Sequence, residues 1–285
     1  MNVWIQKNKK RIFALIFALL IVSGSVMHLH YENTALQVTK KMYHSPALPL
    51  SFDSCTIAVV SDLHNSKSKK LTDSLVAALE DASPDLIVVT GDLIDAYHPD
   101  VDAAVSFIER IVPVAPIYFV TGNHEGALED DTDLFTRLED LGVNMLDNRN
   151  QEIKTGVYLA GVRDPAMQHA QFLEPDAVMR FYLEETGLKK NAFQILLAHR
   201  PEFIEDYAQA GADIVLSGHA HGGQIRLPLI GGLYSPGQGL FPQYTAGSYS
   251  QGETTMFVSR GLGSSMFPFR VNNRPELLLV SFQYS

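Results

Sequence analysis

The chain has 285 residues, 46% of them hydrophobic, so it can form one large domain or two small ones with a sizeable core. This composition argues against extensive disorder. The formal net charge is -10, and because a nucleic-acid surface needs a basic face, we expect no nucleic-acid partner. The single cysteine, Cys55, excludes an intramolecular disulfide.

The N-terminal segment combines a basic stretch with an apolar one. Residues 7–11 hold four basic side chains, and residues 12–27 are uncharged and mostly apolar. This is the order found in signal peptides and signal anchors. The apolar run is shorter than the ~20 residues of an ordinary span, although residues 28–31 could extend it. We expect residues 1–31 to be a single-pass transmembrane anchor; a cleaved signal peptide and a buried soluble helix are the alternatives.

The basic flank also predicts an orientation. Because positive residues stay on the cytoplasmic side, the remainder of the chain should lie outside the cytoplasm. We therefore expect a cell-membrane protein with an extracytoplasmic catalytic domain, or a secreted protein if the segment is cleaved.

Residues 32–50 look like a connector with a short strand at 36–38, and residues 51–285 like one domain. Within that domain, apolar runs alternate with amphipathic stretches. Strands are predicted at 55–61, 86–90, 117–120, 194–198 and 213–217, with shorter ones within 143–161. Helices are predicted at 69–82, 101–112, 130–141, 175–186 and 201–209. The tail, 223–285, is strand-rich, with runs at 254–259 and 277–283. This alternation is typical of an α/β fold with a largely buried sheet.

The first strand of this domain ends in a pair of metal-capable side chains. The run from Ile57 to Val60 is apolar and is followed by Ser-Asp-Leu-His. Residues two apart in an extended segment point the same way, so Asp62 and His64 should leave the strand together. One oxygen and one nitrogen ligand suit a divalent metal ion, although the tripeptide alone is a weak signal.

Four further strand ends carry similar side chains. They are Gly-Asp-Leu-Ile-Asp at 91–95, Gly-Asn-His-Glu at 122–125, His199, and Gly-His-Ala-His-Gly-Gly at 218–223. Taken singly, each has an ordinary interpretation as a turn or a structural histidine. In open α/β sheets, however, ligands collect at the carboxyl ends of strands. The five motifs together therefore predict a metal site.

The order of these motifs resembles the calcineurin-like metallophosphoesterase superfamily, strongly over residues 55–225. More narrowly, the chain looks like the membrane-anchored bacterial phosphodiesterases of the YkuE/YaeI type, a likeness also carried by Ser-Arg-Gly-Leu-Gly at 259–263 and Arg-Pro-Glu-Leu at 274–277. Ala220 stands where many relatives have threonine. The resemblance implies a two-sheet β-sandwich flanked by helices.

The resemblance also implies two divalent metal ions and assigns their ligands. One ion would be held by Asp62, His64 and His221, the other by Asn123, His199 and His219, with Asp92 bridging both. His124 would lie beside the substrate phosphate as a hydrogen-bond donor or general acid. Histidine, aspartate and asparagine ligands without cysteine favour Mn, Fe, Zn, Ni or Co.

Several neighbouring residues have less definite roles. Asp95 and Glu125 are expected to orient ligands. Arg163 could hold a phosphate and Asp164 could orient a ligand, but the two could equally form an ordinary surface pair. Arg200, next to a proposed ligand, is open in the same way.

The implied reaction is hydrolysis of a phosphate ester by metal-bridging hydroxide. A phosphodiester is preferred, and it could be a phospholipid or nucleotide-linked lipid, because the anchor would hold the site near a bilayer. Residues 227–249 form an apolar loop that should rim the pocket or, alternatively, pack on the sheet edge. Its apolar side chains are Leu229, Ile230, Leu233, Tyr234, Leu240, Phe241 and Tyr244. Alternative functions are a phosphomonoesterase of the same fold, a non-catalytic metal-binding cell-surface module and a zinc hydrolase acting on C–N bonds. The oligomeric state stays open.

Overall fold

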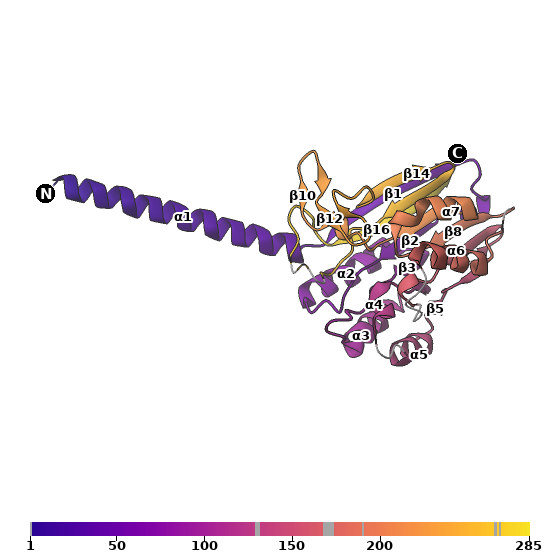
Figure 1. Ribbon diagram of the computed structural model, residues 1–285. Helices are drawn as coiled ribbons and strands as arrows, with labels where there is room; N and C mark the ends of the chain where they lie inside the picture. Colours follow the sequence, from indigo (N-terminus) through magenta and orange to yellow (C-terminus); the bar gives the residue numbers. More distant parts are fainter. Residues whose placement is uncertain (1, 129–131, 168–173, 190, 265–266, 268) are drawn as a thin grey trace.

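A computed structural model describes residues 2–128, 132–167, 174–189, 191–264, 267 and 269–285, with side chains from residue 8 onward. Two six-stranded sheets form the centre of the domain, helices cover their outer faces, and one long N-terminal helix projects away from it (Figure 1). The two-sheet α/β architecture expected from the sequence is therefore confirmed.

The first sheet has the strand order β1-β16-β2-β3-β4-β5 and the second the order β14-β15-β9-β8-β7-β6. The strands of the first are β1 (Gln37–Ser45), β2 (Thr56–Val60), β3 (Leu86–Thr90), β4 (Ile117–Val120), β5 (Asn144–Met145) and β16 (Glu276–Tyr284). Those of the second are β6 (Arg149–Lys154), β7 (Val157–Gly161), β8 (Phe193–Leu197), β9 (Ile214–Ser217), β14 (Gly247–Gln251) and β15 (Thr254–Val258). Strands β2 to β5 run parallel, as do β7, β8, β9 and β15. Each parallel set therefore brings its carboxyl ends to one edge of its sheet.

The helices follow the expected alternation. They are α1 (Asn2–Thr34), α2 (Lys69–Ala82), α3 (Val101–Ile111), α4 (Asn123–Gly126), α5 (Thr132–Asp140), α6 (Pro175–Thr186) and α7 (Ile204–Ala210). Two short hairpins follow β9: β10 (Arg226–Leu227) with β11 (Gly231–Gly232), and β12 (Tyr234–Ser235) with β13 (Gly239–Leu240). The predicted helix at 201–209 is split, because a 3-10 turn over Pro201–Phe203 precedes α7. Residues 130 and 131 of another predicted helix lie outside the described residues.

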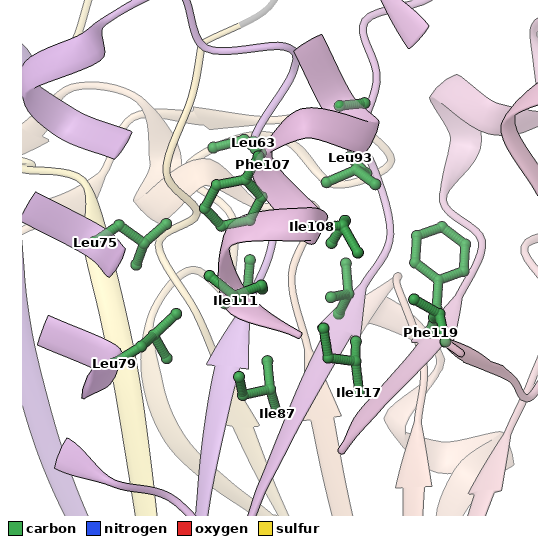
Figure 2. Close-up of a cluster of buried hydrophobic side chains, with 14 of the residues drawn as sticks. Leu63, Leu75, Leu79, Ile87, Leu93, Phe107, Ile108, Ile111, Ile117 and Phe119 are labelled. Atoms are coloured by element: carbon green, nitrogen blue, oxygen red, sulfur yellow. The ribbon is translucent and has the colours of Figure 1, made fainter. Parts of the chain in front are cut away.

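The central strands of each sheet are buried on both faces, which explains the unbroken apolar runs. In β2, Ile57 and Val59 pack between the sheets, whereas Ala58 and Val60 face the helices of the first sheet. Side chains alternate between faces along a strand, so a strand buried on both sides is apolar throughout. Figure 2 shows the helix side of this sheet, where Leu79 packs near Ile87.

The segment expected as a connector contains a longer strand than predicted. The short strand at 36–38 is instead β1, which pairs in parallel with β16 along all nine residues, from Gln37 with Glu276 to Ser45 with Tyr284. Its partner lies some 240 residues further along the chain, and local pattern carries no signal for such a pairing.

Helix α1 is a candidate membrane span. Its Asn8–Thr34 portion is long and apolar enough to cross a bilayer, and the apolar stretch of this portion is not buried against the domain. The last turn of the helix contacts the domain, through Tyr31, Glu32 and Asn33.

Candidate metal centre

The candidate ligands meet where the carboxyl ends of the two sheets face each other. Asp62 and His64 follow β2, Asp92 follows β3, Asn123 opens α4 after β4, His199 follows β8, and His219 and His221 follow β9. All except Asn123 are buried. The fold therefore brings the seven side chains of the sequence prediction to one place, although they span 160 residues of chain.

The ligand atoms fall into two groups that share one carboxylate. Potential ligand atoms of Asp62, His64, Asp92 and His221 lie within 4.8 Å of one another, as do those of Asp92, His199 and His219. The Asp92 Oδ2 atom lies 3.7 Å from His64 Nε2 and 3.2 Å from His199 Nε2. Asp92 is thus placed to contact both an ion in the first group and an ion in the second.

Ring nitrogens face each other within each group. The Nε2 atoms of His64 and His221 are 3.2 Å apart, and His219 Nδ1 lies 3.0 Å from His199 Nε2. His199 Nε2 is also 3.1 Å from Asn123 Oδ1. At these distances each pair can share a ring proton in the metal-free protein or direct lone pairs at one cation, and N and O donors without sulfur suit a borderline divalent metal. The residues present therefore fit two divalent ions.

Burial keeps most of these histidines neutral. It lowers the pKa of His64 to about 4 and that of His221 to about 3, and it lowers the pKa of His219 as well. Neutral imidazole is the form that binds metal, so these three rings are ready for an ion at neutral pH.

Asp92 and His199 behave differently because they face each other. Burial would raise the pKa of Asp92 and lower that of His199, but their mutual attraction outweighs burial in both. The pKa of Asp92 lies well below its usual range, and that of His199 rises to about 10. His199 Nδ1 donates to the Thr90 carbonyl at 2.7 Å, so Nε2 is the nitrogen directed at the second group.

Five of the seven candidate ligands have a left-handed backbone. These are Asp62 (φ 52°), Asp92 (φ 52°), His64 (φ 48°), His219 (φ 64°) and His221 (φ 46°). Such angles are uncommon for non-glycine residues and persist where the surrounding structure enforces them, often at functional sites. The sharp turns allow several side chains from short loops to converge on one point.

Close packing explains why the Gly-His-Ala-His motif begins with a glycine, Gly218. A Cβ atom on Gly218 would lie 1.8 Å from Ser61 Oγ and 2.6 Å from Asp62 Oδ2. Only glycine lets the loop that carries His219 approach the one that carries Asp62, and the His219 N–H then donates to Asp62 Oδ1 at 3.0 Å.

Glu125 ties two of the ligand loops together. Its carboxylate accepts hydrogen bonds from the backbone N–H groups of Gly122 (2.7 Å), Asp92 (2.9 Å), Leu93 (2.9 Å) and Ile94 (3.2 Å). Burial and then the negative charge of Asp92 raise the pKa of Glu125 to about 7. Its position agrees with the expectation that it orients ligands rather than binding metal itself.

His124 and Asp95 form the side of the cluster next to the first group. The N–H of Ala96 donates to His124 Nδ1 at 3.0 Å, so this nitrogen is the acceptor and a ring proton lies on Nε2. Asp95 accepts from the N–H of Tyr97 at 2.8 Å and lies 3.9 Å from His64 Nδ1. The exposed Tyr97 ring, which the sequence did not single out, packs edge-on against His124 at 5.7 Å.

The two arginines considered from the sequence have different surroundings. Arg163 lies 3.5 Å from Asp147 and lines a small cavity that contains none of the candidate ligands, so we assign it no role in phosphate binding. Asp164 instead pairs with Arg200, accepting from its Nε at 2.8 Å and its Nη2 at 3.0 Å. The Asp164–Arg200 pair holds the segment that follows His199.

A buried layer behind His221 was missed by the sequence reasoning. Asn273 Nδ2 donates to the carbonyl oxygens of His221 (2.7 Å) and Gln224 (3.1 Å). Arg270 is fully buried and donates to the carbonyls of Arg260 (2.8 Å) and Gly263 (2.6 Å). Both belong to an irregular segment without periodicity, so only the Arg-Pro-Glu-Leu motif beside it gave any signal.

Comparison with known proteins places the chain in a family. The calcineurin-like phosphoesterase model matches residues 55–223, more than half of the chain. The chain therefore belongs to the calcineurin-like phosphoesterase family, hydrolases that use divalent metals.

Related chains agree with this assignment. The chain is 27% identical over 281 residues to the metallophosphoesterase YkuE of Bacillus subtilis (strain 168), covering 95% of this chain and 94% of that protein. It is 33% identical over 250 residues to a Bos taurus transmembrane protein with metallophosphoesterase domain, covering 83% of this chain but only 54% of that protein. It is 28% identical over 233 residues to phosphodiesterase YaeI of Escherichia coli (strain K12), covering 79% and 80%. The crystal structure of TT1561 of Thermus thermophilus, at 13% identity and a TM-score of 0.52 over 73% of this chain and 90% of that one, shares the fold.

Proposed function

We propose that the chain is a membrane-anchored phosphodiesterase that works with two divalent metal ions, manganese among them, on the outer side of the cytoplasmic membrane. The observation that carries the proposal is the Asp92 carboxylate, which both ligand groups share. A bridging carboxylate is what two adjacent dications require, since they repel each other strongly. Bound ions of this kind neutralise phosphate charge and make a water molecule nucleophilic at neutral pH.

The ligand roles follow from the grouping. Asp62, His64 and His221 would hold one ion with Asp92, and His199, His219 and Asn123 would hold the other with Asp92. Glu125 fixes the loop that carries Asp92, and Asp62 fixes the backbone of His219. These contacts hold the ligands in place independently of the ions.

His124 would supply a proton during the reaction. Because the Ala96 N–H donates to Nδ1, we place the ring proton on Nε2. We assign His124 Nε2 to the leaving-group oxygen, where it stabilises the charge that develops as the ester bond breaks.

The surroundings favour a diester over a monoester. A phosphomonoester carries about two negative charges at neutral pH, and a diester carries one. Arg163 and Arg200 flank the strand ends but are paired with Asp147 and Asp164. Neither guanidinium is therefore offered to a phosphate dianion. The name of the E. coli relative, phosphodiesterase YaeI, points the same way.

The test is hydrolysis of bis-p-nitrophenyl phosphate and p-nitrophenyl phosphate by the detergent-solubilised full chain, stripped of metal and then supplied with Mn²⁺. We expect metal-dependent turnover with a preference for the diester. Asp92→Asn should reduce it by a factor of roughly 100 or more and lower bound metal, measured by elemental analysis, whereas Asp81→Asn, on the exposed face of α2, should change neither. Preference for the monoester would favour a phosphomonoesterase, and metal binding without turnover of either ester would favour a non-catalytic metal-binding module.

A further inference from the structure

The foot of helix α1, defined as Glu32 and Asn33, contacts the layer behind His221. Asn33 Oδ1 accepts from the Arg270 N–H at 2.7 Å, and Asn33 Nδ2 donates to the Arg270 carbonyl at 3.0 Å. The Glu32 carboxylate accepts from the Asn273 N–H at 2.7 Å, and Asn273 in turn holds the His221 carbonyl. A chain of two hydrogen bonds therefore joins the end of the candidate membrane span to the metal cluster.

Exposed apolar residues of both hairpins lie near this foot: Leu229 and Ile230 in the β10–β11 turn, and Leu240 and Phe241 at the end of β13, away from the β12–β13 turn. We call these four the exposed hairpin residues. Leu229 is fully exposed, and Ile230, Leu240 and Phe241 are 62–68% exposed. The β10–β11 hairpin starts beside the foot. The Arg226 N–H donates to the carbonyl of Val271, which directly follows Arg270. Figure 1 shows β10 and β12 on the side of the domain where α1 joins it. Four exposed aliphatic and aromatic side chains on adjacent hairpins are unfavourable in water and indicate a partner.

The apolar residues of the 227–249 loop differ in exposure. Leu233 and Tyr244 are half-buried. The Leu233 N–H donates to the Gly223 carbonyl at 3.0 Å, and the Tyr244 ring packs edge-on against Tyr249 at 5.1 Å. These contacts fix the loop to the domain, whereas the four exposed hairpin residues remain open to solvent.

A cavity connects the foot of α1 with the cluster of candidate metal ligands. It measures about 370 Å³, and its lining includes Asn33 from α1, His64 and Asp95 from the cluster, and Lys67 and His98 from neighbouring loops. The wall is largely polar, and the exposed Lys67 adds a positive charge. With one cation in Lys67 and one carboxylate in Asp95, the cavity suits a polar, hydrogen-bonding group attached to the phosphorus that reacts.

We propose that the exposed hairpin residues Leu229, Ile230, Leu240 and Phe241 lie in the bilayer surface beside α1, and that the substrate is a phosphodiester lipid whose head group enters the foot cavity. The bilayer is the partner of these residues because the adjacent helix is itself a candidate span. Exposed aliphatic and aromatic side chains of this kind insert at the boundary of head groups and acyl chains. The membrane contact stands by itself, whereas the lipid substrate rests on the proposed phosphodiesterase activity.

The reaction on such a lipid is a hydrolysis. A water oxygen forms a new bond to phosphorus, and the bond from phosphorus to one ester oxygen breaks. That oxygen leaves as an alcohol with the proton from His124 Nε2, and a proton from the water restores the ring. The products are one phosphomonoester and one alcohol, and no oxidant or reductant is needed.

The membrane contact is tested with fluorescent probes on the full chain. The one native cysteine, Cys55, is buried, so Leu229→Cys and Phe241→Cys can each be labelled with an environment-sensitive NBD group and reconstituted into phosphatidylcholine–phosphatidylglycerol vesicles. Leu50→Cys is the matched control, since Leu50 is 72% exposed but lies beyond the far end of β1, ~30 Å from the foot for a nine-residue strand. We expect blue-shifted emission at 229 and 241 that spin-labelled lipids quench at least twice as strongly as at 50.

Equal quenching at all three positions would overturn the membrane contact. A blue-shifted but unquenched probe would also overturn the membrane contact. Such a result would show that a protein surface, such as a second copy of the chain, covers the exposed hairpin residues.

The lipid substrate is tested with Leu229→Ser/Phe241→Ser against Leu50→Ser. The double variant should hydrolyse bis-p-nitrophenyl phosphate within twofold of the parent but lose at least fivefold on a fluorescent phosphatidylglycerol in vesicles. Equal losses on both substrates, or a parent enzyme that cleaves the soluble diester but not the vesicle lipid, would overturn the lipid proposal. A parent enzyme inactive on the soluble diester would overturn the proposed function instead, and the probe experiment would still decide the membrane contact.

Discussion

His199 shows how a single side chain determines the protonation of the metal-free site. It is buried beside the Asp92 carboxylate, which raises its pKa to about 10 against the effect of burial, whereas His64 and His221 have their pKa lowered to about 4 and about 3. At pH 8 the first histidine is therefore protonated and the other two are neutral. Because a metal displaces the proton of its ligand, an ion that binds the group with His199 must displace a proton. An ion that binds the group with His64 and His221 need not.

We expect His199 Nε2 to contribute about one proton to those released when metal binds at pH 8. Calorimetric titration of Mn²⁺ into the metal-free protein in Tris and in HEPES measures the number of protons released, since the observed heat changes with the ionisation enthalpy of the buffer. His199→Gln should reduce the release by about one proton. Because the pKa of His199 is raised to about 10, this residue has no proton to release at a higher pH, and its contribution should disappear as the pH rises above about 10. A release that is zero in the parent, or unchanged in the variant, would contradict the assignment.

Among the secondary-structure elements, β1 links helix α1 to the phosphoesterase domain. It follows α1 after two residues and pairs with β16 along its whole length. Thr39 Oγ1 also donates to Glu276 Oε1 at 2.6 Å. β1 is an edge strand with Lys40 and Lys41, and charged side chains on an edge oppose pairing with other molecules. β16 has no such protection, since Leu277 to Val280 are buried.

Removal of β1 should therefore destabilise the domain more than removal of α1. We expect a chain starting at residue 36 to be soluble and cooperatively folded. A chain starting at residue 50 should melt on the order of 10 °C lower, because a nine-residue ladder is lost, and it should self-associate through the uncovered edge of β16. Thermal unfolding by circular dichroism and size-exclusion chromatography measure the two effects. Identical melting temperatures with two monomeric proteins would show that the folding unit begins after β1.

At the scale of the whole molecule, the sequence predicts the architecture well where information is local. Continuous apolar runs marked β2, β3 and β4 because these central strands are buried on both faces. The polar residues after those runs predicted the cluster, because parallel strands end at one edge. What could not be predicted depends on distant contacts: the pairing of β1 with β16, the left-handed turns at the ligands, and the support of His221 by Asn273. The ion pair of Arg163 with Asp147 was not predicted for the same reason, since the two residues are neighbours in space and not in sequence.

The orientation of the molecule in the membrane is a further property of the whole chain. Four basic residues precede the apolar run of α1, and two, Lys40 and Lys41, follow it within about twenty residues. This bias predicts an N-terminus in the cytoplasm and a domain outside. Alkaline phosphatase fused after Ser285 in a bacterial host should therefore be active, since that enzyme needs an oxidising compartment for its disulfides, and green fluorescent protein fused at the same place should be dark. Replacing Lys7, Lys9, Lys10 and Arg11 with asparagine should raise the fluorescent fraction, because the charge bias is then reversed. A fluorescent parent fusion with inactive phosphatase would place the candidate metal ligands, the foot cavity and the exposed hairpin residues on the cytoplasmic side of the membrane.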